Sequence, residues 1–121
     1  MKTFKIRAAK GQKEYWVVRV HNNWVKLFLA FYKMSGVPEN FLAVCIRNKK
    51  GKNKMGEIMF TKKHATPEIV SHELAHAANY YMELKKKKIV FDTKDDGWKE
   101  NDEMYATMVG DMVGQFWRKY K

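Results

Sequence analysis

The sequence predicts a small α+β domain in which helices pack on a mostly antiparallel sheet. The chain has 121 residues, of which 45% are hydrophobic and 14% aromatic, enough for one packed core but too few for two domains. Short segments of apolar alternation are typical of strands, and longer segments with helical spacing are typical of helices. Their order is β-β-α-β-β-α-α, so residues 1–121 are expected to form a single domain.

The first part of the chain is expected to form a β-hairpin and a helix. Residues 3–9 and 14–20 alternate around a Gly-Gln turn, as two paired strands would. A helix should follow, capped by Asn22 or Asn23 and ended before Pro38. Its apolar side chains at helical spacing are Trp24, Leu27, Phe28, Phe31 and Tyr32.

The second part is expected to supply two strands and two helices. Residues 41–47 and 57–61 have strand character and are joined by a turn rich in lysine, glycine and asparagine. Thr66 is followed by proline and glutamate, a sequence that favours the start of a helix. A polar loop over residues 92–97 then leads into a last helix from about Lys99 to the C-terminus.

Basic residues outnumber acidic ones and are clustered. There are 24 Lys and Arg against 13 Asp and Glu, which gives a net charge of +11. The clusters are residues 47–54, residues 85–88, and the group Arg118, Lys119 and Lys121. Such clusters could bind nucleic acid through its phosphates or steer an acidic protein partner, but no base-reading motif accompanies them.

Cysteine content and hydropathy favour a cytoplasmic protein that is not in a membrane. The one cysteine, Cys45, excludes an intramolecular disulfide and a cysteine-based metal knuckle, and its apolar neighbours suggest a small core residue. The first seven residues carry charges where a secretory signal would be apolar. No apolar run approaches the length of about 18 residues that a membrane-spanning helix needs.

The most informative feature is the pentad H-E-L-A-H at residues 72–76, in the helix that begins after Thr66. Histidines four residues apart lie one above the other on a helix face, so His72 and His76 can reach one ion. Glu73 lies one step further round, close enough to touch a water on that ion. The H-E-x-x-H pattern is the catalytic core of zinc-dependent peptidases, in which the carboxylate is the general base. The pentad therefore predicts Zn²⁺ held by the two histidines, with Glu73 as the catalytic residue.

Helical spacing divides this helix, which should end near Leu84, into two faces with Glu73 on their boundary. The face expected to lie against the core carries Val70, Leu74, Ala77, Tyr81 and Leu84. The other face carries His72, His76, Asn79 and Glu83. A purely structural helix has no need of histidines along its second face, which favours a metal site.

A catalytic zinc ion takes three protein ligands and leaves one position open for water. The other histidines, His21 and His64, precede the motif, so the pattern favours a downstream carboxylate as third ligand. Glu103 is the best candidate because small residues share its helix face, and these would let two helix backbones approach closely. The small residues are Ala106, Thr107, Gly110 and Gly114. Asp102 and Asp111 are the reserve candidates for the third ligand. The alternative role for Glu103 is that of an acid in the first turn of the helix, where its charge complements the helix dipole.

Residues 92–103 also match the calcium loop of an EF-hand, except at its third position, where Lys94 replaces a carboxylate. An ammonium inside a calcium cage is electrostatically unfavourable. The segment is therefore interpreted as a turn and helix cap.

Residues 56–114 resemble the minimal gluzincin-type zinc metallopeptidases, including small metallopeptidase-like proteins of phage genomes and the ImmA/IrrE-type family that cleaves repressors. The resemblance rests on the strand G-E-I-M-F at residues 56–60, the H-E-L-A-H helix, and D-E-x-x-A at residues 102–106. It implies a zincin-like domain in which the strand at residues 57–61 borders the substrate cleft and Glu73 activates water. It also implies that the zinc ligands are His72, His76 and Glu103.

The expected function is hydrolysis of peptide bonds in a protein or peptide substrate, with a zinc-activated water and Glu73 as general base. Tyr80, Tyr105 and His64 are candidates for stabilising the oxyanion. One alternative is a metal-stabilised basic binding module that contacts nucleic acid or an acidic protein partner without proteolysis. Another is a basic interaction protein with no metal. Glu73 favours the enzyme, because a structural zinc site usually fills four protein positions and has no use for a carboxylate beside a water.

Overall fold

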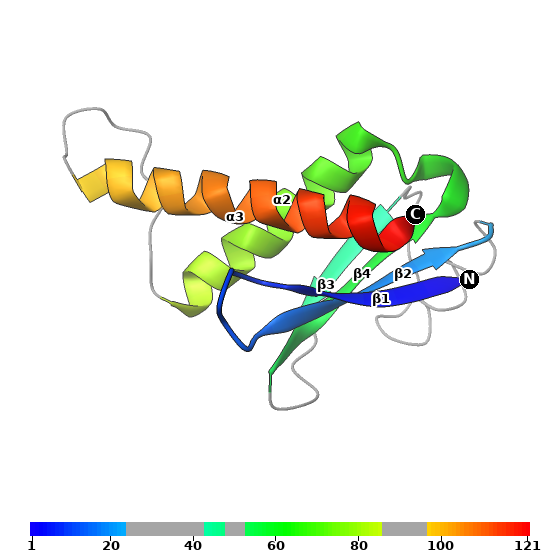
Figure 1. Ribbon diagram of the computed structural model, residues 1–121, viewed down its shortest axis with the longest axis horizontal. Coiled ribbons are helices and arrows are strands. Elements are labelled where there is room, and N and C mark those ends of the chain that lie inside the picture. Colours follow the sequence, from blue (N-terminus) through cyan, green and yellow to red (C-terminus); the bar gives the residue numbers. More distant parts are fainter. Residues whose placement is uncertain (24–42, 48–52, 86–96) are drawn as a thin grey trace.

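In the computed structural model, the described residues form an α+β fold, with a four-stranded mixed sheet and two helices on one of its faces (Figure 1). The structure describes residues 1–23, 43–47, 53–85 and 97–121. The strands are β1 (Lys2–Arg7), β2 (Tyr15–His21), β3 (Ala43–Arg47) and β4 (Lys54–Thr61). The 3-10 helix η1 (Lys62–His64) and the helices α2 (Pro67–Leu84) and α3 (Gly97–Tyr120) complete the described elements.

The sheet has the order β1-β2-β4-β3 and combines both kinds of pairing. β1 and β2 form the expected antiparallel hairpin, with Lys2 opposite Val20 and Arg7 opposite Tyr15. Gly11, between these strands, has a φ of 78°, a conformation that glycine adopts without strain. β4 runs parallel to β2 and antiparallel to β3. Two of the three pairings are therefore antiparallel, as in the mostly antiparallel sheet that the sequence predicts.

β4 is longer than expected and lies inside the sheet. β4 begins at Lys54 rather than at Glu57, because its first residues already pair with β2 opposite Tyr15 and Trp16. β4 also has a partner strand along each side, so its backbone hydrogen bonds are used within the sheet. β4 therefore has no free backbone edge where it pairs with both strands, and the expectation that residues 57–61 border a substrate cleft stays a prediction. In the described sheet, the outer strand that contacts α2 is β3.

α2 begins where the sequence predicts. The side chain of Thr66 caps it by accepting a hydrogen bond of 3.4 Å from the backbone N–H of Ile69, and Pro67 occupies the first turn. α3 begins at Gly97, slightly before the expected Lys99, a difference within the usual uncertainty of helix ends. None of the helices in the described ranges is long and apolar enough to cross a membrane.

Some expected features lie outside the described residues. These are the helix expected after Asn23, most of the basic turn at residues 47–54, the lysines at 86–88, and the loop at residues 92–96 that resembles a calcium site.

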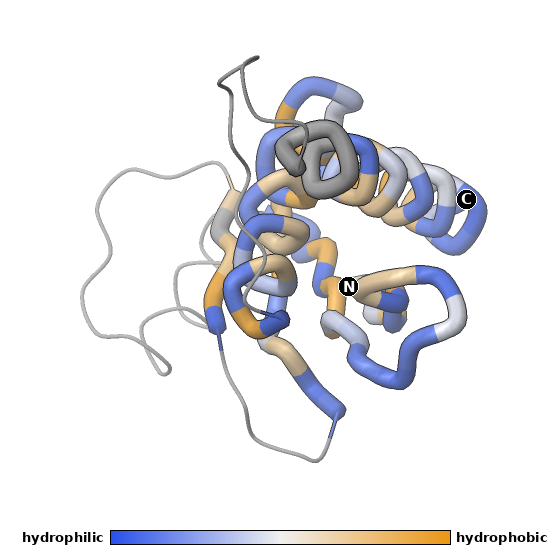
Figure 2. The backbone as a smooth tube through the Cα atoms, turned by 90° about the vertical axis from the view of Figure 1, so that its left-hand side faces the viewer, coloured by the Kyte–Doolittle hydropathy of each residue, from blue (hydrophilic) through white to orange (hydrophobic). Residues whose placement is uncertain are grey.

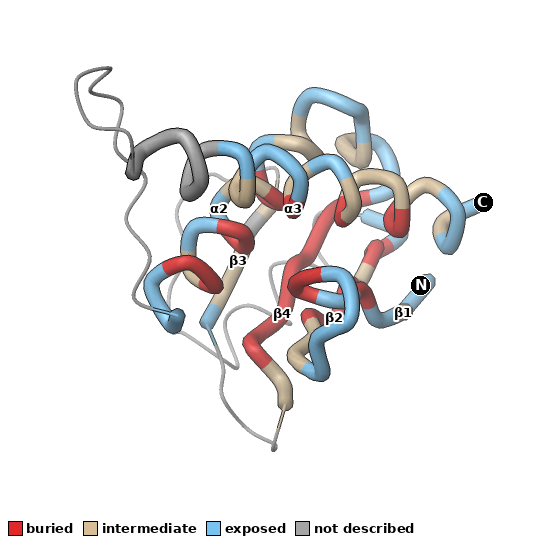
Figure 3. The backbone as a smooth tube through the Cα atoms, turned by 60° about the vertical axis from the view of Figure 1, so that its left-hand side comes forward, coloured by how far each residue is buried: buried red, intermediate tan, exposed pale blue. Residues whose placement is uncertain are grey.

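The core lies between the sheet and the two helices. Buried residues, red in Figure 3, run along β4 and occur on both helices. Hydrophilic and hydrophobic residues alternate along α3, as expected of a helix with one face on a core (Figure 2). Phe116 of α3 is fully buried, with its ring centroid 5.5 Å from that of Phe4 and 5.4 Å from that of Phe60. This aromatic contact holds the C-terminal half of α3 on the sheet.

Candidate metal centre

His72 and His76 lie on the exposed side of α2, one helical turn apart. Their Nε2 atoms are 3.2 Å apart, and their rings meet edge to face with centroids 4.8 Å apart. Two nitrogens bound to one tetrahedral zinc ion at about 2.0–2.1 Å lie about 3.3–3.4 Å from each other. The imidazoles are thus already spaced as two ligands of one ion would be.

Glu73 lies beside the histidine pair but on the buried side of the helix. Only 8% of its surface is exposed. Burial raises the pKa of its carboxyl above the ordinary value, and the nearby charges of His76 and His72 partly oppose this shift. A carboxyl that holds its proton more readily than usual suits a group that must take a proton and later return it.

The packing of α2 explains this division between exposed histidines and a buried glutamate. Most of the residues predicted to face the core are buried, namely Val70, Leu74, Ala77 and Tyr81. Ala78 and Met82 are buried as well, so the buried face is wider than predicted and extends to Glu73. The prediction for Leu84 is wrong, since it is 38% exposed at the last residue of the helix.

Cys45 of β3 lies close enough to Glu73 for the charge of the carboxylate to affect the pKa of the thiol. Burial raises the pKa of the Cys45 thiol far above its ordinary value, and the negative charge of Glu73 raises it further. The thiol therefore stays protonated, which suits the half-buried core residue that the sequence predicts and argues against a thiolate ligand. Sequence reasoning did not foresee this proximity, because it depends on which strand packs beneath α2.

The polar face of α2 beyond His76 connects the helix to β3. Glu83 accepts a hydrogen bond of 3.1 Å from Nη1 of Arg47, which also makes this contact an ion pair. The guanidinium of Arg47 lies 5.0 Å from the ring centre of Tyr80, and that ring lies 6.2 Å from Trp16. Glu83 and Tyr80 thus have evident roles in the packing of α2.

The other two candidates for oxyanion stabilisation lie on different elements. His64 is in η1, with Nδ1 2.9 Å from Oγ1 of Thr61. Tyr105 is half-buried on α3 and packs against the core. Neither forms a hydrogen bond with His72 or His76 in the described part of the chain.

Glu103 is exposed on α3, and the structure does not bring it together with the histidine pair. Among the described residues, no group of three or more His, Cys, Asp or Glu side chains is placed to hold an ion. The reserve Asp111 accepts a hydrogen bond of 2.8 Å from Gln115 within α3. The side chain of Asp102 is not among those described.

The small residues next to Glu103 do not form a helix contact, so this part of the sequence argument is wrong. Ala106, Thr107 and Gly110 are exposed, and a methyl group on Gly110 would meet no atom within 4 Å. α3 instead packs through the face that carries Met108, Met112 and Phe116. The four-residue spacing of these apolar residues is a sequence signal that could have placed Glu103 on the opposite face.

Comparison of the chain with protein-family models, curated proteins and solved structures finds no match. The resemblance to gluzincin-type peptidases therefore stays a prediction from motifs.

Replacing Gly110 with alanine should stabilise the protein by about 0.5–1 kcal/mol, because glycine costs roughly this much within an exposed helix. The open space around Gly110 leaves the new methyl group without a clash. Denaturant unfolding would measure the change. Gly114→Ala is the comparison and should gain less, because its methyl would lie 3.2 Å from Nη1 of Arg118, which would have to move. A destabilised Gly110→Ala variant would instead support the prediction that another helix packs closely against this face of α3.

Proposed function

We propose that the chain is a zinc-dependent metallopeptidase with a zincin-like domain, acting on a protein or peptide substrate. The observation that carries this proposal is the 3.2 Å separation of the two Nε2 atoms in the H-E-x-x-H motif. The buried carboxyl of Glu73 beside them supports it. A pair of merely solvated histidines gives no reason for a glutamate to be buried next to them.

The proposal gives each residue of the motif a separate task. His72 and His76 hold the ion through Nε2, which requires both imidazoles to be neutral at that atom. Zinc, when bound, acidifies a water and polarises the substrate carbonyl. Glu73 takes the proton from the attacking water and passes it to the leaving amine. The raised pKa of Glu73 helps the second part of this task, because its protonated form is easier to reach.

Glu103 is proposed as the third ligand on the strength of the family resemblance alone, and its carboxylate would have to come closer to the histidine pair than it lies in this structure. Its side chain is exposed and has no hydrogen bond or ion pair with another described residue, so it is available to a ligand. Glu83, an exposed carboxylate on the same face of α2 as the two histidines, is engaged by Arg47. Removing each glutamate in turn therefore compares a carboxylate that is free to bind zinc with one that is already paired.

Protein purified without a chelator or an affinity tag should contain about one zinc ion per chain, and His72→Ala should lose it, because one histidine alone binds zinc weakly. Elemental analysis would measure the content. Asn79→Ala is the matched control, since Asn79 is also exposed on α2, one turn beyond His76. The absence of metal from wild-type protein, even after zinc is added back, would remove the metallopeptidase proposal.

Glu73→Gln should keep the zinc content near normal but lower peptide turnover by about 10²–10⁴-fold, because it removes the proton acceptor while keeping the shape of the side chain. Turnover would be followed on a fluorescence-quenched peptide library with zinc-loaded protein. Retained turnover in this variant would contradict the role of Glu73 as the base.

Glu103→Ala should weaken zinc retention about tenfold or more, whereas Glu83→Ala should leave it unchanged, because Glu83 pairs with Arg47. Competition with a zinc chelator would measure retention in both variants. Equal retention by Glu103→Ala and wild-type protein would reject Glu103 as the ligand without affecting the roles of the two histidines.

A further inference from the structure

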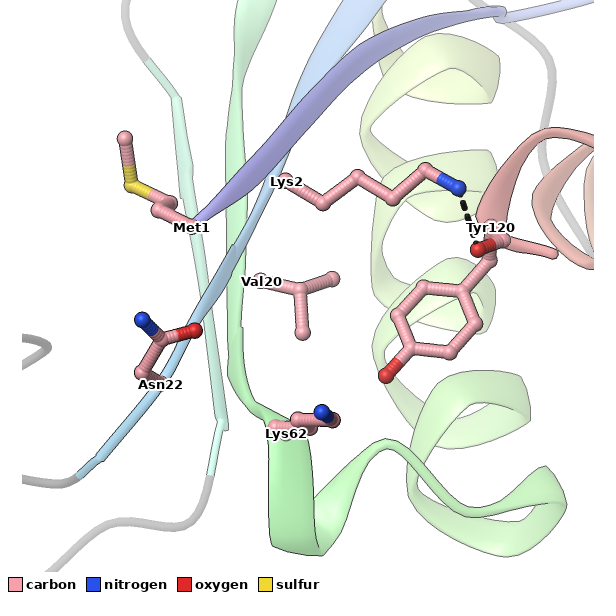
Figure 4. A pocket seen from close by; sticks show the side chains of 6 residues that line it. All are labelled: Met1, Lys2, Val20, Asn22, Lys62 and Tyr120. Atoms are coloured by element: carbon pink, nitrogen blue, oxygen red, sulfur yellow. Dashed lines mark hydrogen bonds between the residues drawn. The ribbon is translucent and has the colours of Figure 1, made fainter.

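A pocket of about 370 Å³ lies beside the last turn of α3, formed by residues that have no part in the candidate metal centre. Figure 4 shows Lys2 and Lys62 on either side of Val20, with Tyr120 of α3 facing them. The described residues that line it are Met1, Lys2, Val20, Asn22, Lys62 and Tyr120.

The register of the sheet explains why these side chains meet. Lys2 is paired with Val20, and Val20 is paired with Phe60 in β4. Val20 and Phe60 belong to the core that lies under the helices. Asn22 and Lys62 follow directly after the ends of β2 and β4, so they join the lining at the end of the sheet. The pocket is thus a continuation of the core face of the sheet, with polar side chains in place of apolar ones.

The end of α3 forms the opposite wall and is held in place by Lys2. Nζ of Lys2 donates hydrogen bonds of 2.5 Å and 3.0 Å to the backbone carbonyls of Tyr120 and Lys121. A cation at this position complements the negative end of the helix dipole. The ring of Tyr120 stacks on Phe116, with centroids 5.3 Å apart, so this wall is anchored to the core.

The charge of the lining is positive on both sides of the pocket. Lys62 has no ion pair or hydrogen bond with another residue in the described ranges, so its ammonium is available to a ligand. The carboxylates that do form ion pairs, Glu14, Glu57 and Glu83, form them with cations that do not line the pocket. None of the described residues that line the pocket is acidic.

We propose that this pocket binds a phosphate group, carried either by a small phosphorylated molecule or by a nucleic-acid strand. A phosphate has several oxygens that can accept hydrogen bonds from the ammonium of Lys62, in a pocket whose lining carries the second positive charge of Lys2. The volume lies at the small end of the range typical of ligand pockets, which suits one phosphate and its immediate substituent. The site is separate from the proposed zinc chemistry and does not depend on it.

The neighbouring lysines of η1 provide a matched pair of variants. Lys62 lines the pocket, whereas Lys63 is an exposed lysine in the same 3-10 helix that does not line it. Removing either side chain changes the net charge equally, so nonspecific attraction falls by the same amount in both. Pyrophosphate binding, measured by calorimetry, should weaken about tenfold in Lys62→Ala, since one charge-assisted hydrogen bond is lost. The affinity of Lys63→Ala should stay within about twofold of wild-type protein.

A fluorescent oligodeoxythymidylate then distinguishes the two sources of phosphate. The pocket takes a nucleic-acid phosphate if pyrophosphate displaces the bound oligonucleotide and if Lys62→Ala, but not Lys63→Ala, lowers the affinity for it. If only pyrophosphate shows this difference between the variants, the pocket takes a small phosphorylated molecule. Equal weakening by both substitutions would attribute binding to general surface charge and overturn the proposal. Failure of both probes to bind at millimolar concentration would overturn it as well.

Discussion

The burial of one face of α2 against the sheet is the constraint on which the candidate metal centre depends. Leu74, Ala77 and Tyr81 are fixed by the core beneath them, so the rotation of the helix about its axis is fixed too. Once this rotation is set, His72 and His76 must lie towards solvent and Glu73 must lie at the edge of the buried surface. The exposure of the two imidazoles and the shifted pKa of the glutamate both follow from it.

The parts of the fold that could be predicted are those set by local chemistry. Thr66 and Pro67 define the start of α2 through a cap and a fixed backbone angle, and neither depends on distant residues. The hairpin of β1 and β2 was predictable for the same reason, since its strands alternate around a glycine turn. The histidine pair was predictable because a four-residue spacing has only one geometry on a helix.

The parts that could not be predicted depend on contacts between elements far apart in the sequence. No local pattern indicates that β4 lies between β2 and β3, and this arrangement puts Cys45 next to Glu73. The face of α3 was misjudged because small residues were taken as a sign of close helix contact, whereas Gly110 has open space around it. The pocket beside the end of α3 was also beyond sequence reasoning, because Lys2, Lys62 and Tyr120 come from three separate elements.

The pairing of β4 with β2 also has a consequence for the order in which the chain folds. β1 and β2 are neighbours in sequence, so their hairpin closes a short loop and can form early. The parallel contact between Val18 and Ile58 joins strands that are far apart in the chain, and a larger loss of chain entropy must precede it. α2 packs on a sheet that is incomplete until that contact forms, so the burial of Glu73 depends on a pairing between strands far apart in the chain.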